Sequence, residues 1–411
     1  MSRDPEEFMN DLEKLFDETG VAIFKDIQFF IDSLVLRPPK AAGYQAATMA
    51  TQMLQPIAKR AEFVWKDSKL ATITEDYPSE INVITFKRKG GKNVVIGGEK
   101  YPPFYSFLGK NPNRPVVTAD VFDVPIHTKE RPSILRLSKP VKEHFLNPDV
   151  STNPGLWAKK HVEEFGADMI TLHFIGTDPT LPEKEGGNQS VRQALEHLEQ
   201  VMDAVDVPII IGGSGNHRKD VELFTGVADM IAGNRFMLSS VELDTYEKIV
   251  PVAKKYDQIV LSWTQLDVNN QKKLNSEILD MGLSKDLIVM DPTVGPLGYG
   301  IEYSFSVYER MRLSGLKGEE TLAFPMSGGT TNAWGAREAF MADKLRPEWG
   351  PRAFRGPLWE ILTAFILSIV GLDLAMMLHP GSVAGFKDII EKLSAPKPSK
   401  PVDGLKWITM K

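Results

Sequence analysis

Short apolar runs alternate with longer amphipathic stretches along most of the chain, beginning near residue 116. Runs of this length indicate strands buried on both faces, and their alternation with helices is typical of a parallel sheet covered by helices. Eight such units in succession favour an α/β fold of the closed (β/α)8 or TIM-barrel class over an open sheet. The predicted strands are 116–122, 169–175, 207–211, 229–232, 258–263, 287–290, 321–325 and 372–378, and helices are expected at 154–166, 189–205, 241–256, 269–281 and 300–313.

A different pattern precedes the predicted barrel. Apolar residues such as Phe8, Leu12 and Leu15 recur at helical spacing through residues 1–70. The β-branched runs 81–86 and 93–98, joined by a basic turn containing glycine, predict a β-hairpin. We therefore expect a helical N-terminal extension (1–75), a β-hairpin with the segment leading into the barrel (76–115), the barrel itself (116–393) and a C-terminal tail (394–411).

Composition narrows the function classes. Hydrophobic residues make up 42% and charged residues 25% of the 411 positions, and the net charge is −6, which disfavours nucleic acid or an anionic membrane as the main partner. Cysteine is absent, which excludes an iron–sulfur cluster held by thiolates of this chain. The apolar stretch 361–372 is too short for a membrane span and predicts a buried helix. Without a secretory signal pattern, we expect a cytoplasmic protein.

The loops that follow the strands are where a barrel of this class carries its site. Three of these loops, at 212–217, 291–300 and 327–332, are rich in glycine. Glycine allows close backbone approach, and the amides of such loops suit a phosphate, a carboxamide or the edge of a flat macrocycle. Turns between strands and helices also need glycine for their own geometry. The pattern therefore favours a polar, glycine-lined mouth without naming its ligand.

Individual side chains at the strand ends are open to two interpretations. Asp120 and Asp123 could form an acid/base pair, although carboxylates in turns are more often solvated or capping residues. His173 lies within an apolar strand, where a hydrogen-bonded core histidine is the simpler interpretation. The seven histidines follow no metal-binding spacing, and neither a P-loop nor a dinucleotide motif occurs. We expect no metal site and no nucleotide chemistry.

Seven segments, taken in order, carry a likeness to a known family. They are N-P-G-x-W-A-K (153–159), E-x-G-A-D-M-I (164–170), S-W-T-Q-L-D (262–267), D-P-T-V-G-P-L-G-Y-G (291–300), M-S-G-G-T-T-N (326–332), R-G-P-L-W-E (355–360) and M-M-L-H-P (376–380). Together they resemble the small subunit of the corrinoid iron–sulfur protein, whose archaeal counterpart is the delta subunit of acetyl-CoA decarbonylase/synthase. The corrinoid-binding pattern D-x-H-x-x-G is only partly matched at 171–176, where Thr171 stands in place of the aspartate. We expect no cobalt ligand from this chain.

The resemblance implies a barrel that pairs with a large (gamma) corrinoid iron–sulfur subunit and with the rest of the complex. That pair moves a methyl group between a methyl-tetrahydropterin and the nickel site that forms acetyl-CoA, and its corrinoid (cobamide) lies at the mouth of this barrel. Two alternatives stay open, a free-standing pterin-binding methyltransferase barrel with Asp120, Asn234 and Asp291 at strand ends, and a mainly architectural subunit. The residues expected to contact the corrinoid are Thr177, Gly213, Ser214, Asn234, Thr293, Gly295, Gly298, Tyr299, Ser327, Gly328, Gly329, Thr330 and Asn332.

Overall fold

The computed structural model describes residues 77–104, 111–125, 143, 147, 150 and 152–395. The chain divides into two units, Met1–Ile73 and Thr74–Lys411, and everything described below belongs to the second. The predicted helical extension over 1–75 and nearly all of the predicted tail over 394–411 lie outside the described residues. The predicted domain boundaries therefore stay predictions.

Eight parallel strands close into a barrel in the order β10-β3-β4-β5-β6-β7-β8-β9, which confirms the predicted fold class. Strand β10 seals the ring because it pairs with β9 on one side and with β3 on the other. The strands are β3 (Val116–Phe122), β4 (Met169–His173), β5 (Ile209–Gly212), β6 (Met237–Val241), β7 (Ile259–Trp263), β8 (Ile288–Asp291), β9 (Met326–Gly329) and β10 (Leu372–Met377).

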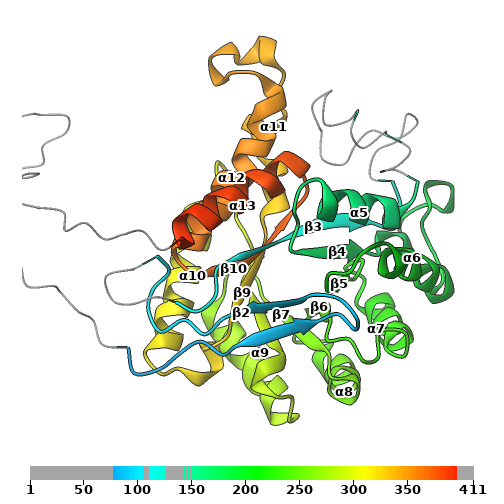
Figure 1. The fold of residues 1–411 in the computed structure, drawn as a ribbon, viewed down its shortest axis with the longest axis vertical. Coiled ribbons are helices and arrows are strands. Elements are labelled where there is room, and N and C mark those ends of the chain that lie inside the picture. Colours follow the sequence, from blue (N-terminus) through cyan, green and yellow to red (C-terminus); the bar gives the residue numbers. More distant parts are fainter. Residues whose placement is uncertain are drawn as a thin grey trace, which may run out of the picture. The chain divides into compact units, whose positions relative to one another are not determined.

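Helices surround the barrel, and α12 lies beside α13 (Figure 1). Several begin at side-chain caps, such as Ser190, which forms a capping box with Gln193. None of the described helices combines the length and apolarity needed to cross a bilayer. The helices are α5 (Pro154–Glu163), α6 (Val191–Ala204), α7 (His217–Val227), α8 (Tyr246–Tyr256), α9 (Val268–Asp280), α10 (Ile301–Leu316), α11 (Arg337–Phe340), α12 (Arg352–Ile369) and α13 (Pro380–Ser394), with short 3-10 turns that include η4 (Glu320–Leu322) and η5 (Thr330–Gly335).

Two of the predicted strands are wrong in position. The run 229–232 lies in the turn that follows α7, and the fourth barrel strand is β6, several residues later. The run 321–325 spans the end of η4 and the residues before β9, and the seventh strand is β9 itself. Both true strands carry serine or glycine where a continuous apolar run was expected, because their ends line a polar barrel mouth. The predicted loop 327–332 is therefore partly strand.

The predicted hairpin is confirmed, with β1 (Ile84–Lys87) antiparallel to β2 (Asn93–Ile96). Its apolar residues Ile84, Phe86 and Ile96 are fully buried. Lys87 forms a backbone bridge with Arg235, just before β6. The hairpin therefore packs at the amino ends of the barrel strands, opposite the mouth.

A buried ionic network also lies at the amino ends of the strands. Arg312 of α10 pairs with Glu99 at 3.0 Å and with Asp373 of β10, and it donates to the carbonyl of Gly371 at 2.7 Å. Asp373 in turn accepts the backbone N–H of Met326 at 2.7 Å. Burial and Glu99 raise the pKa of Asp373, against the lowering effect of Arg312. The network joins the segment after the hairpin to α10, β9 and β10.

Candidate functional site

Three side chains from separate elements meet at the carboxyl ends of the strands. Asp120 of β3 is buried, and its Oδ1 lies 3.1 Å from Nε2 of His173, the last residue of β4. Thr331 in η5 donates its hydroxyl to the other oxygen, Oδ2, of the same carboxylate. These hydrogen bonds link β3, β4 and the segment after β9, and they hold the imidazole in one orientation.

The imidazole of His173 is accessible as well as oriented. Its ring stacks on Phe122, with centroids 4.9 Å apart and an interplanar angle of 22°, while the side chain is 24% exposed. The carboxylate at one imidazole nitrogen fixes the orientation of the ring. The prediction of a hydrogen-bonded histidine is confirmed, but the side chain reaches solvent at the mouth.

Asp123, in the loop after β3, and Asp291, at the end of β8, carry buried carboxyl groups. Both carboxylate oxygens of Asp123 accept the N–H of Gly176, at 3.0 and 3.1 Å, so Asp123 serves the loop after β4 rather than pairing with Asp120. Asp291 ends β8 and accepts the N–H of Thr293 at 2.8 Å. Burial raises the pKa of each group to about 7 in spite of these donors. The mouth therefore carries carboxyl groups that can hold a proton near neutral pH.

The segment R-G-P-L-W-E (355–360) organises the rim where α12 meets η5. Glu360 accepts the N–H groups of Leu378 at 2.5 Å and His379 at 3.2 Å, and Nε1 of Trp334 lies 3.3 Å from its Oε2. Burial raises the pKa of Glu360 to about 7. A side chain at Gly356 would meet the Trp334 ring, since an added Cβ would lie 2.2 Å from Cζ3. Glycine is required there by close packing.

The glycine loop after β5 is held by an aspartate on α7. Asp220 accepts the backbone N–H groups of Ser214 at 2.7 Å and Gly215 at 3.0 Å, and the Ser214 hydroxyl at 3.0 Å. Burial raises the pKa of Asp220 despite these donors. An added Cβ at Gly213 would lie 2.4 Å from the Asp220 carboxyl carbon. The loop is thus shaped by its own helix.

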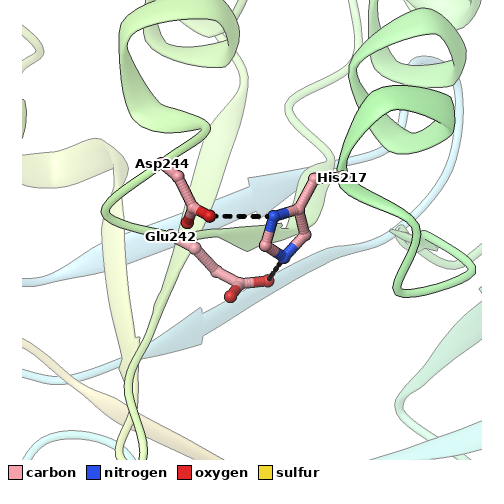
Figure 2. A group of neighbouring side chains, drawn as sticks. All are labelled: His217, Glu242 and Asp244. Carbon is pink, nitrogen blue, oxygen red and sulfur yellow. Dashed lines mark ion pairs between the residues drawn. The ribbon is translucent and has the colours of Figure 1, made fainter.

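A second cluster at the mouth joins α7 to the loop after β6 (Figure 2). Nε2 of His217 lies 3.3 Å from Glu242, and Nδ1 lies 3.1 Å from Asp244. Among the described residues, this is the group whose side-chain atoms lie close enough together to hold a metal ion. Each ring nitrogen of His217 already faces a carboxylate, so direct side-chain contacts hold the cluster together. Sequence reasoning missed Glu242 and Asp244 because it placed the fourth strand too early.

The predicted corrinoid contacts divide into accessible and buried residues. Thr293 and Gly298, both at positive φ, belong to the loop after β8, where Tyr299 is 73% exposed. The accessible or partly accessible set is Gly213, Ser214, Thr293, Gly295, Gly298, Tyr299, Gly329 and Asn332. The buried set is Thr177, Asn234, Ser327, Gly328 and Thr330.

The buried residues include one predicted on the wrong side of the barrel. Asn234 precedes β6, and its Oδ1 accepts the backbone N–H of Lys89 in the hairpin at 2.8 Å. The prediction that Asn234 lies at the mouth is therefore wrong, because the fourth strand begins after it. Gly328 lies within β9, and an added Cβ would point to Tyr308 of α10, 2.6 Å from its hydroxyl. The space into which a side chain at Gly328 would point is therefore already filled, on the side of the barrel that faces the helices.

Comparison with known proteins identifies related sequences. The family model described as "CO dehydrogenase/acetyl-CoA synthase delta subunit" matches residues 83–347. The acetyl-CoA decarbonylase/synthase complex subunit delta of Archaeoglobus fulgidus is 43% identical over 385 residues, covering 91% of this chain and 81% of that protein. The Methanocaldococcus jannaschii protein of the same description is 41% identical over 399 residues, covering 94% and 92%.

Among solved structures, this chain is similar to a 7,8-dihydropteroate synthase from Vibrio fischeri ES114. It is 16% identical, with a TM-score of 0.46, and the alignment covers 77% of this chain and 100% of that chain.

Proposed function

Because the chain belongs to the delta subunit family of CO dehydrogenase/acetyl-CoA synthase, we propose that it is the barrel subunit of a corrinoid methyl carrier. It pairs with the large (gamma) corrinoid iron–sulfur subunit and covers one face of the corrinoid with its barrel mouth. The pair then moves a methyl group between a methyl-tetrahydropterin and the acetyl-CoA-forming nickel site. The sequence likeness to delta subunits over most of the chain carries this proposal.

The accessible residues at the mouth are of the type that suits a large ligand edged with amides. The loops after β5, β8 and β9 offer backbone groups next to glycine, and Ser214 and Asn332 add polar side chains. An iron–sulfur cluster would come from the partner, since this chain contains no cysteine. When bound, the corrinoid supplies the methyl-carrying metal, and this chain supplies its surroundings.

Gly329 provides a direct test of the corrinoid position. An added Cβ there would have the Asn332 side chain at 3.9 Å as its nearest neighbour, so the first atom of a side chain at this position has room, and Gly329→Leu adds bulk at the mouth. Gly335, at the other end of η5, has open space around an added Cβ and is the matched control. In the pair reconstituted with hydroxocobalamin, Gly329→Leu should lower the cobalt content measured by visible absorption, whereas Gly335→Leu should not. Equal content in both variants would contradict the proposal.

A second candidate function is methyl transfer by this barrel itself. The observation that favours it is the hydrogen-bonded set Asp120, His173 and Thr331. When a methyl group leaves an amine nitrogen, the carbon–nitrogen bond breaks and its electron pair stays on nitrogen, which then takes a proton. His173 is placed to supply that proton, with Asp120 stabilising the charged ring.

An assay on the purified chain, without the large subunit, distinguishes the two functions. N5-methyl-tetrahydropterin and free cob(I)alamin are mixed with the purified chain, and methyl transfer is followed by the change in cobalt absorption. Transfer that falls by about 100-fold or more in Asp120→Asn and by less in Thr331→Val would support catalysis by this barrel. Absence of transfer in the wild-type chain would exclude it.

A further inference from the structure

The outward face of α12 is apolar along its whole length. Phe354 is 63% exposed, Leu358 49%, Leu362 38% and Ile369 40%, and these positions follow one another on one side of the helix. The charged residues Arg355 and Glu360 of this helix are buried, and Arg355 donates to the carbonyl of Met341 at 2.5 Å and to Asp343 at 3.1 Å. The predicted buried helix over 361–372 is confirmed as far as Ile369 and is mostly buried, but Leu362 and Ile369 are exposed. No described residue covers this apolar face.

Two exposed tyrosines, one in α10 and one in the loop before it, lie near α12, since an added Cβ at Gly298 would lie 3.0 Å from Nε1 of Trp359. Tyr299 is 73% and Tyr303 65% exposed, next to a loop that is tied to α12. The N–H of Leu297 donates to the hydroxyl of Thr363 at 3.1 Å. We call Tyr299, Tyr303, Phe354, Leu358, Leu362 and Ile369 the α12 face. Of the ten large apolar side chains exposed in the described residues, six belong to it.

The exposed area of the α12 face is in the range expected for contact with a protein partner. With roughly 150–250 Å² for a fully exposed aromatic side chain, the six residues expose about 600 Å² of mostly apolar surface. One side of a standard protein interface buries about 800 Å², and its centre is rich in aromatic residues and poor in charge. The α12 face has the composition of such a centre, because it contains three aromatic residues and no charged residue.

The position of the α12 face identifies which partner fits. The inner side of α12 holds the mouth rim, because Glu360 bonds the backbone at Leu378 and His379 and lies against Trp334. Helix α12 therefore runs from that rim along the outside of the barrel, beside α13 (Figure 1). A subunit that covers the mouth with its corrinoid lies next to this helix. A single partner can then occupy both surfaces.

We infer that the α12 face is the docking surface for the large corrinoid iron–sulfur subunit, which meets it with an apolar surface of its own. This inference rests on the proposed function and adds the place of contact. It predicts that a charge at the centre of the face weakens pairing strongly, because the charge would be buried without a partner.

The test compares two leucines of nearly equal exposure. Leu358, 49% exposed, lies in the α12 face, whereas Leu156, 48% exposed, lies on α5. The full chain is produced as wild type, Leu358→Glu and Leu156→Glu, and its binding to the large subunit is measured by titration. Leu358→Glu should raise the dissociation constant about tenfold or more, with Leu156→Glu within about twofold of wild type. Urea unfolding of each free chain checks that both variants fold like the wild type.

Each alternative occupant of the α12 face predicts a different result in these binding experiments. Equal binding by both variants would overturn the inference while leaving the pairing itself established. No binding by the wild-type chain would overturn the proposed function, and the inference with it. A wild-type homodimer that Leu358→Glu dissociates would assign the face to a second copy. Binding of the wild-type chain to phosphatidylcholine vesicles, abolished by the same variant, would assign it to a lipid surface.

Discussion

Replacing Arg312 by methionine tests the ionic network at the amino ends of the strands. The Arg312 side chain is 1% exposed, and its partners Glu99 and Asp373 are 6% and 5% exposed. Methionine fills similar space but leaves two buried carboxyl groups without their cation. Removing one partner of a buried pair costs about 3–5 kcal/mol of unfolding free energy, because the remaining charge is desolvated and unpaired. The melting temperature should fall by about 10 °C.

The pH dependence of Arg312→Met identifies the cause of the loss. Without Arg312, burial and the nearby Glu99 raise the pKa of Asp373 further, since the lowering effect of the cation is gone. The folded variant then holds protons that the unfolded chain releases. Its stability should therefore rise as the pH falls from 8 to 5, and its deficit relative to wild type should shrink. Urea unfolding at several pH values measures this deficit.

A matched control and a second variant complete the test. Arg235 also contacts two carboxylates, Asp257 and Asp286, but these are 59% and 45% exposed, so Arg235→Met should cost about 1 kcal/mol or less. Adding Asp373→Asn to Arg312→Met should recover part of the loss, because one buried charge is removed. A cost below about 1 kcal/mol for Arg312→Met, or a deficit independent of pH, would refute the reasoning.

Three further outcomes follow from the barrel mouth. Gly328→Val should destabilise the fold by about 1–3 kcal/mol in urea unfolding, because its side chain would enter the space beside Tyr308, and a variant of wild-type stability would contradict this. Gly356→Ala should lose about 1–2 kcal/mol despite better helix propensity, with a changed Trp334 fluorescence as the local readout. Burial raises the pKa of Glu360 from 4.5 to about 7, so the folded protein holds a proton there that the unfolded chain releases. The resulting stabilisation is complete below pH 4.5, and about 3 kcal/mol of it should be lost as the pH rises to 7. Glu360→Gln should flatten that part of the profile, and an unchanged slope would assign it to other groups.

The barrel could be predicted from the sequence because strand and helix periodicities are local properties of the chain. Strands such as β3 and β10 are apolar except at one or two positions, since both faces of a parallel barrel strand are buried. Prediction failed at β6 and β9, whose inward positions near the mouth hold Ser239, Ser327 and Gly329. Small and polar residues there serve a site rather than a core, and they interrupt the apolar pattern.

The site itself depended on the tertiary structure. Along the chain, Asp120 is 53 positions from His173 and 211 positions from Thr331. Only the pairing of β3 with β4 and β10 in the closed barrel brings the three side chains within hydrogen-bond distance. Periodicity likewise predicted an apolar helix near residue 361 but not which of its faces lies outside. Local spacing determines what a segment can form, whereas burial and pairing depend on which distant segments pack against it.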